Sequence, residues 1–351
     1  MLYRIGVPLA PLTTLRVGGP AARMMTLDRE DLLEEALAGA DAAGEPVFVL
    51  GSGSNIVVSD AGFPGLVLRM GICGIEVSRD GDRAVVDVAA GEDWDALVAR
   101  AVVEGWSGVA SMSGIPGLVG ATPIQNVGAY GQEVSDTITS VRVFDRERRE
   151  FRDVAPADCG FGYRASVFKR SPRWIVMRVR FVFERSPTER VRYAELARAL
   201  GVKEGEEAPA ARLRETVIEL RRGKGMVLDP GDPESVSAGS FFVNPIVDAA
   251  TVARVEAAAG QRPPGFDAGQ GRTKLAAAWL VERAGFAKGW TLGRAGVSRK
   301  HALAIVNRGG ATASEILAAA RAIRDGVRDR LGVTLEPEPV IVGGSGEDGD
   351  L

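Results

Sequence analysis

One stretch of the chain, residues 111–134, limits its fold more than any other. It reads SMSGIPGLVGATPIQNVGAYGQEV and holds five glycines, two prolines and a single charged residue in 24 positions. A solvent loop of this length would be more polar, and such long loops are uncommon in compact domains unless they have a function. The segment is therefore either a buried, winding connection or backbone packed against a large ligand, and we favour the ligand.

A second glycine-rich turn, GSGSN at residues 51–55, follows an apolar strand pattern. Successive backbone N–H groups in such a turn form a concavity that suits a phosphate. The turn does not match the dinucleotide fingerprint G-x-G-x-x-G, because its sixth position is Ile56 and the next residues have a strand pattern. It also lacks the lysine of a P-loop. Taken alone, GSGSN is either a phosphate cradle or an ordinary hairpin turn.

The composition limits the classes of protein to consider. With 351 residues, the chain is long enough for two or three domains. A net charge of −3 argues against nucleic-acid binding, which needs concentrated positive charge. Two cysteines, Cys73 and Cys159, and one histidine, His301, predict neither a disulfide framework nor a metal site.

The N-terminal residues MLYRIGVPLAPLTTL have no long apolar core behind a basic start, so no secretory signal is expected. No apolar run approaches the roughly 20 residues that span a bilayer. We therefore expect a cytoplasmic protein without membrane insertion. We also expect a monomer, although no sequence feature indicates the oligomeric state. The polar, glycine-rich tail at 344–351 is expected to be disordered.

Hydrophobic periodicity predicts a mixed α and β chain. The first 70 residues have the pattern of short strands joined by glycine turns, and two further strands are predicted at 84–90 and 173–184. Helical spacing and end signals predict helices at 92–105, 210–225, 273–285 and 312–332. Thr312 and Glu315 have the spacing of a capping box. A last strand, VTLEPEPVIVG, is expected to return and close the structure.

Eight motifs in a fixed order resemble the UDP-N-acetylenolpyruvoylglucosamine reductase family, and the resemblance runs from about residue 10 to 343. They are TLRVGGPA (14–21), GSGSN (51–55), the segment 111–134, CGFGYRASVFK (159–169), SAGSFFVNP (237–245), AAWLVERAG (277–285), VSRKHALAIVN (297–307) and LEPE (335–338). Val243, Thr122 and the ending EPV after Pro337 depart from the usual family pattern, and none of these departures removes a proposed catalytic group.

The resemblance implies an α+β fold. It consists of an FAD-binding part of the vanillyl-alcohol oxidase and p-cresol methylhydroxylase type, in two subdomains, and a smaller α/β substrate-binding domain. The expected boundaries are subdomain 1 at 1–70, subdomain 2 at 71–207, the substrate domain at 208–333, and a C-terminal strand at 334–343 that returns to the FAD-binding part.

The resemblance also implies the reaction. NADPH, through non-covalently bound FAD, reduces UDP-N-acetylglucosamine enolpyruvate to UDP-N-acetylmuramate for peptidoglycan synthesis. Both glycine-rich stretches would then hold the FAD. The implied cofactor residues are Gly51, Ser52, Gly53, Ser54, Asn55, Ser113, Gly114, Ile115, Gly117, Gly120, Ala121, Gln125, Asn126 and Gly128.

Three catalytic residues follow from the same resemblance. Arg164 would bind the substrate carboxylate, since a guanidinium binds a carboxylate in bidentate fashion and stays charged. Ser240 would donate a proton to the α-carbon, and Glu338 would stabilise the enolic intermediate or help to poise the acid. From the residues alone, Arg164 is equally a surface arginine, Ser240 a turn-capping serine and Glu338 a strand-end carboxylate.

Four residues are expected at the substrate. Tyr193 resembles the tyrosine that closes over the nucleotide in the long-loop subclass, Lys224 and Asn244 match positions that bind diphosphate and sugar, and Lys274 is a further candidate. His301 lies in a family motif, and we expect it to be structural. Two other hypotheses stay open: an oxidase of small alcohols or lactones on the same scaffold, and a silent flavin- or UDP-sugar-binding protein.

Overall fold

The computed structural model describes residues 2–344. Its residue contacts divide the chain into two compact units, which we describe separately. Unit 1 holds residues 2–7, Ala22–Ser52 and Pro64–Val227, and unit 2 holds Pro8–Ala21, Gly53–Phe63 and residues 228–344. Apart from residue 344, the expected disordered tail lies outside the described residues.

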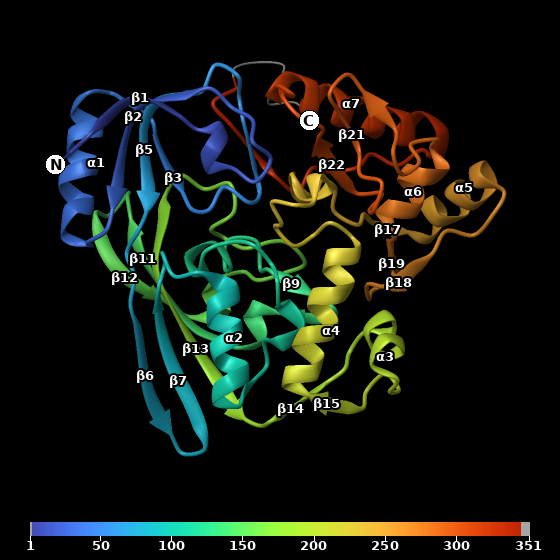
Figure 1. Cartoon of the computed structure of the whole chain (residues 1–351), viewed down its shortest axis with the longest axis horizontal. Coiled ribbons are helices and arrows are strands. Elements are labelled where there is room, and N and C mark those ends of the chain that lie inside the picture. The colour runs from blue at the N-terminus through green and yellow to red at the C-terminus, as the bar shows by residue number, and fades with distance from the viewer. Residues whose placement is uncertain (1, 345–351) are drawn as a thin grey trace. The chain divides into compact units, whose positions relative to one another are not determined.

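The first sheet of unit 1 has four strands, in the order β1 (Arg4–Pro8), β2 (Pro20–Leu27), β5 (Phe63–Met70) and β3 (Val47–Leu50). Helix α1 (Asp31–Ala42) follows β2 and lies beside this sheet in Figure 1. Its buried residues Leu33 and Leu37 pack with Leu66 and Leu68 of β5. Our prediction of strands alone in the first 70 residues misses this helix, although its buried apolar residues recur at helical spacing.

The second sheet of unit 1 is antiparallel, in the order β12 (Glu150–Val154), β11 (Ile138–Asp145), β13 (Trp174–Arg185), β7 (Arg83–Ala89) and β6 (Ile75–Asp80), with β8 (Trp106–Ser107) also pairing β13. Strands β7 and β13 confirm the two strands predicted by alternation. Helix α2 (Trp94–Glu104) confirms the helix predicted at 92–105, and Asp93 caps it by accepting a hydrogen bond from Ala96 N. Trp94 and Phe181 are fully buried between α2 and β13 and fix this helix on the sheet.

The last part of unit 1 contains the hairpin β14 (Thr188–Arg190) and β15 (Glu207–Pro209), α3 (Ala194–Leu200) and α4 (Ala210–Gly223). Leu213 and Val217 of α4 pack in one buried cluster with Leu196 and Leu200 of α3. Because α4 packs there, the two compact units divide after Val227, whereas we expected a domain boundary at 208.

Among its described residues, unit 2 contains two antiparallel sheets and one parallel strand pair, which is described below. One has the order β16 (Ser237–Ser240), β22 (Ala304–Asn307), β21 (Ala295–Val297) and β20 (Thr291–Leu292), and the other has the order β17 (Ile246–Asp248), β19 (Arg272–Leu275) and β18 (Gly265–Asp267). Three helices, α5 (Ala249–Ala259), α6 (Ala277–Arg283) and α7 (Ala313–Leu331), complete its core. Figure 1 shows them in orange and red. The capping box predicted for Thr312 and Glu315 is confirmed at the start of α7.

The helix predicted at 273–285 is wrong in its first turn. Residues Arg272–Leu275 form strand β19, which pairs with β17 and β18, and α6 begins only at Ala277. Pairing on both sides outweighs the helical propensity of these residues.

The returning C-terminal strand is β23 (Val340–Val342), which pairs in parallel with β4 (Ile56–Val58). By residue contacts, both strands belong to unit 2. Among residues 2–344, no helix is long and apolar enough to cross a membrane.

Candidate active site

The glycine-rich segment 111–134 lies in unit 1 and is anchored at both ends by one buried carboxylate. Glu189 Oε1 accepts hydrogen bonds from the N–H groups of Val109 and Ala110, at 3.3 and 3.1 Å. Its Oε2 accepts from Gln132 Nε2 at 2.6 Å, and Gln132 Oε1 accepts from Ser111 N at 3.0 Å. The segment is therefore a winding connection with fixed ends, and not a solvent loop.

The beginning of this segment is also bonded to α2. Asp95 accepts a hydrogen bond from Gly114 N at 2.6 Å and binds Arg214 of α4 through two N···O contacts of 2.6 and 2.8 Å. Burial raises the pKa of the Asp95 carboxyl, but the bonds from Arg214 and Gly114 outweigh it and hold this pKa below its usual value. Asp95 therefore stays ionised and fixes the position of Gly114.

Arg221 of α4 lies against the same glycine. Its Nε is 3.6 Å from the position that a Cβ on Gly114 would take, and its Nη2 donates to Met226 O at 2.8 Å. Burial lowers the pKa of Arg221 to about 10, so the guanidinium remains charged at neutral pH. Arg221 Nε and Ser111 Oγ are both buried without a hydrogen-bond partner among the described residues. Two such unsatisfied polar atoms beside one glycine-rich segment suit a large, partly anionic ligand.

Arg164 is held at the same segment. It occupies a tight turn closed by the paired backbone groups of Gly162 and Ala165, with φ of 53°. Its Nη2 donates to Gly128 O at 2.6 Å, and Asn126 Nδ2 donates to Gly162 O at 3.1 Å. A left-handed conformation is uncommon for a non-glycine residue and marks strain that the surroundings must support.

Asn126 itself has φ of 46° and is fully buried. Its side chain also donates to Glu133 Oε2 at 2.6 Å and accepts from Ser135 N at 3.1 Å. With these three bonds Asn126 positions the Arg164 turn, so its side chain is already committed to protein partners. Any role for Asn126 in binding FAD would fall to its backbone.

Two tyrosines and a lysine form a second cluster in unit 1. Tyr193, just before α3, packs edge-to-face on Tyr130, with ring centroids 5.6 Å apart. Lys224 Nζ lies 5.6 Å from the Tyr130 ring centroid and 2.5 Å from Glu195 Oε2. Burial raises the pKa of Tyr130 to about 12 and also raises that of Tyr193, so both phenols remain protonated hydrogen-bond donors.

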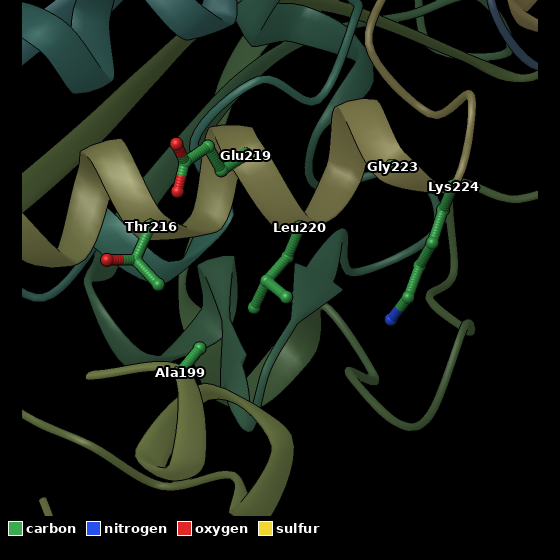
Figure 2. A pocket seen from close by; sticks show the side chains of 6 residues that line it. All are labelled: Ala199, Thr216, Glu219, Leu220, Gly223 and Lys224. Atoms are coloured by element: carbon green, nitrogen blue, oxygen red, sulfur yellow. The ribbon is translucent and has the colours of Figure 1, made fainter. Parts of the chain in front are cut away.

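Lys224 also borders a groove of about 510 Å³ between α3 and α4. Figure 2 shows Thr216, Leu220 and Lys224 pointing from one face of α4 toward Ala199. Because Thr216 and Leu220 are four positions apart, they lie in one row on the helix, and Lys224 follows directly after its last residue.

Ser240 ends strand β16 in unit 2. A register shift between Ser237 and Ser240, where both pair with β22, marks a bulge, and Gly239 within it has φ of 76°. Gly239 N donates to Ser237 Oγ at 3.2 Å. Bulges of this kind redirect a side chain at the end of a strand. Phe241 and Phe242 follow and are almost fully buried, which fixes the strand end.

Glu338 lies on the chain segment that pairs with these phenylalanines. Glu338 N donates to Phe241 O at 2.9 Å, and Val243 N donates to Glu336 O at 3.1 Å. Asn55 connects the predicted GSGSN turn with the segment that holds Glu338, because its Nδ2 donates to Glu338 O at 3.4 Å and its O accepts from Val340 N at 3.0 Å. Unit 2 therefore brings the Ser240 segment, Glu338 and the end of GSGSN together.

The GSGSN turn itself divides between the units, with Gly51 and Ser52 in unit 1 and Gly53, Ser54 and Asn55 in unit 2. Gly53 has φ of 66°, and a Cβ there would collide with the carbonyl oxygen of Leu12. The turn thus requires glycine at this position. It packs on the TLRVGG motif, where Thr14 N donates to Gly53 O at 3.1 Å.

The remaining predicted cofactor residues lie along 111–134. Ser113 Oγ donates to Ala110 O at 2.7 Å, and the side chain of Ile115 packs on the unit 1 core. Gly117 O accepts from Trp94 N, Gly120 N donates to Ala90 O, and Ala121 N donates to Leu118 O. Gln125 precedes Asn126, and Gly128 begins the short hairpin of β9 (Gly128–Ala129) and β10 (Gln132–Glu133).

Two predicted substrate residues lie in unit 2. Asn244 Oδ1 accepts from Ala277 N at 2.9 Å at the start of α6. Lys274 of β19 places its Nζ 6.0 Å from the Phe266 ring centroid. His301 Nδ1 accepts from Leu303 N at 3.2 Å, as expected of a structural histidine.

Neither cysteine has a reactive thiol suited to a covalent bond with a flavin. Cys73 is exposed and Cys159 is buried, and both are free thiols. Burial raises the pKa of Cys159 to about 11 and also raises that of Cys73, so the reactive thiolate is scarce at neutral pH.

Four residues of these clusters are not among the predicted site residues: Asp95, Tyr130, Glu195 and Arg221. Glu195 stands two positions after Tyr193, and Arg221 three positions before Lys224, so each neighbours a residue that the motifs had indicated. For Glu195 and Arg221, this closeness along the chain to Tyr193 and Lys224 is the sequence signal that could have indicated them.

Two family models match this chain and define its class of protein. Residues 21–149 match the model of the FAD binding domain, and residues 232–342 match that of the UDP-N-acetylenolpyruvoylglucosamine reductase C-terminal domain. The chain thus combines an FAD-binding domain with a second domain specific to one kind of reductase.

Relatives of full length have the same organisation. The UDP-N-acetylenolpyruvoylglucosamine reductase of Thermobifida fusca is 50% identical over 96% of this chain and 97% of its own length. That of Saccharopolyspora erythraea is 51% identical over 96% and 95%. The crystal structure of the UDP-N-acetylenolpyruvylglucosamine reductase from Thermus caldophilus, 29% identical, superimposes with a TM-score of 0.66 over 97% of this chain and all of that one. The chain belongs to the UDP-N-acetylenolpyruvoylglucosamine reductase family.

Proposed function

We propose that this chain reduces UDP-N-acetylglucosamine enolpyruvate to UDP-N-acetylmuramate, with NADPH as the reductant and FAD as the cofactor. The observation that carries the proposal is the 50% identity to a reductase of this kind along nearly the whole of both chains. The unsatisfied Arg221 Nε and Ser111 Oγ at the glycine-rich segment fit an FAD held there.

The FAD would be held by backbone and side-chain groups of 51–55 and 113–128, with Arg221 as the cation beside Gly114. When bound, FAD would supply the hydride chemistry that connects NADPH with the β-carbon of the enolpyruvyl group. The chain's own residues must hold the substrate, stabilise the charge that develops at its α-carbon, and deliver a proton there.

Arg164 holds the substrate carboxylate. Its guanidinium cannot lose its charge and offers two parallel donors to the two carboxylate oxygens. As negative charge spreads from the α-carbon into this carboxylate, the same contact becomes stronger and stabilises the transition state. The bonds from Arg164 to Gly128 O and from Asn126 to Gly162 O keep the cation in place without neutralising it.

Ser240 donates the proton to the α-carbon from its Oγ. A hydroxyl is a weak acid, so the transfer depends on charged or hydrogen-bonded neighbours that stabilise the alkoxide as it forms. Glu338 lies on the segment paired with Phe241. It either stabilises the enolic intermediate or helps to set the acidity of the Ser240 hydroxyl.

The diphosphate and sugar contact Lys224 and Asn244, with Lys274 as a further contact. Tyr193 closes over the nucleotide, as in the long-loop subclass, and the chain functions as a monomer. The edge-to-face contact of Tyr193 with Tyr130 is the resting position from which it would move.

Two other functions are less well supported. An oxidase of small alcohols often tethers FAD through histidine or cysteine, yet His301 is engaged with Leu303 N and both thiols have raised pKa values. A catalytically inactive protein that only binds flavin or a UDP-sugar would not need Arg164, Ser240 and Glu338 together.

We expect the purified protein to be yellow and to release unmodified FAD when it is denatured. The physical reason is that the glycine-rich stretches offer backbone amides and a buried cation but no group suited to a covalent link. The absorbance of the filtrate after acid or heat denaturation, with mass spectrometry of the released flavin, measures this directly. A colourless protein that takes up no added FAD would overturn the assignment of the cofactor.

A further inference from the structure

Lys224, which the proposed function assigns to the substrate diphosphate, is already paired with an anion of this chain. Its Nζ lies 2.5 Å from Glu195 Oε2, and both side chains are about one-third exposed, at 30% and 33%. Glu195 belongs to the first turn of α3, and Lys224 follows the last residue of α4. The pair therefore joins the beginning of one helix to the end of the other.

Three other charged groups of unit 1 have partners of their own. Asp95 is bound by Arg214, Arg221 donates to Met226 O, and Arg164 donates to Gly128 O. Burial and, in addition, the negative charge of Glu195 raise the pKa of both Tyr130 and Tyr193. Glu195 is thus the carboxylate that compensates Lys224 within this cluster.

We propose that Glu195 is an internal counter-anion that the diphosphate must displace from Lys224. The inference rests on the proposed role of Lys224. An ammonium on a flexible stem is a point charge that can turn from a carboxylate to a phosphate. A diphosphate competes well because it carries more negative charge than one carboxylate, whereas a singly charged anion gains nothing by the exchange.

Two consequences follow for the reaction. Displacing Glu195 lowers the affinity for every diphosphate ligand, product included, and so speeds release of the product. It also frees the first turn of α3 from the end of α4, and Tyr193 immediately precedes that turn. Arrival of the diphosphate is thereby coupled to the release of Tyr193 from its resting contact with Tyr130.

The test is the affinity of FAD-loaded protein for UDP, measured by isothermal titration calorimetry at low and at physiological salt. Glu195→Gln keeps the shape of the side chain and removes its charge. Because the pair is partly exposed, we expect UDP to bind about two- to five-fold more tightly, with the smaller gain at higher salt. Lys224→Met should weaken UDP binding, and adding Glu195→Gln to Lys224→Met should give no further gain.

Glu219→Gln is the matched control, because it removes one negative charge from α4 near the same groove. In Figure 2 the Glu219 carboxylate points sideways at the level of α4, whereas the Lys224 ammonium points below the end of the helix. UDP affinity should not change in this variant.

The remaining outcomes separate the inference from the proposed function. If Glu195→Gln leaves UDP binding unchanged or weaker while Lys224→Met still weakens it, the counter-anion role is wrong and the diphosphate site stands. If the gain persists without Lys224, or appears equally in Glu219→Gln, the effect is general charge repulsion and the proposal is wrong. If Lys224→Met has no effect on UDP binding, both the counter-anion role and the diphosphate role of Lys224 are wrong.

Discussion

Ser240→Ala should bind FAD and accept electrons from NADPH at nearly the normal rate, yet fail to pass them to the enolpyruvyl substrate. Reoxidation by this substrate should slow by roughly two to four orders of magnitude, the usual range for a positioned general acid. That loss corresponds to about 3–5 kcal/mol of transition-state stabilisation. Substrate binding should change little, because only one hydroxyl is removed at a half-exposed strand end.

Rapid-mixing measurements of the two half-reactions check this prediction, and flavin reduction serves as the control within the same variant. If reduction falls as far as reoxidation does, the substitution has disturbed the site as a whole. If reoxidation is unchanged, Ser240 is not the acid. Either result would leave the serine as a structural residue of the bulge that Gly239 forms.

Arg164→Met should lose recognition of the substrate carboxylate while retaining FAD. Removing one partner of a desolvated charge pair costs about 2–5 kcal/mol, which is roughly a 30- to several-thousand-fold weaker complex. UDP-N-acetylglucosamine is the matched control ligand because it lacks the enolpyruvyl carboxylate, and its affinity should be almost unchanged.

Arg164→Lys tests the geometry of the same contact. It keeps the charge but loses the planar fork, so an intermediate loss is expected. Equal weakening of both ligands in Arg164→Met, measured by calorimetry, would show that the substitution acts through the strained turn and its bond to Gly128 O, and not through the carboxylate.

The sequence predicted elements best where the signals were local. Thr312 caps its helix at the position expected, and Asp93 caps the helix predicted at 92–105, because a capping side chain bonds to backbone within its own first turn. Prediction failed at 273–276, where pairing with β17 and β18 determines the conformation, and Asn244, 33 positions earlier, accepts a hydrogen bond from the first residue of α6. A window of local sequence contains neither partner.

The candidate site shows the same contrast between local signals, which the sequence contains, and long-range contacts, which it does not reveal. Motif resemblance indicated Ser240, Glu338 and Arg164 directly, and the low polarity of 111–134 indicated a buried segment. The buried carboxylate of Glu189 anchors this segment by bonding to residues that lie between 57 and 80 positions away in the sequence. Lys224 and Glu195 pair across 29 positions. Such contacts depend on how α3, α4 and the hairpin of β14 and β15 pack, and no spacing in the sequence reveals them.

One anaerobic titration tests the central claim most directly. Protein reduced with one equivalent of NADPH should lose its yellow absorbance, and one equivalent of UDP-N-acetylglucosamine enolpyruvate should restore it. The product should be UDP-N-acetylmuramate, heavier than the substrate by the mass of one hydride and one proton. A flavin that stays reduced after this addition, or that is reoxidised only when oxygen is admitted, would contradict the proposed function.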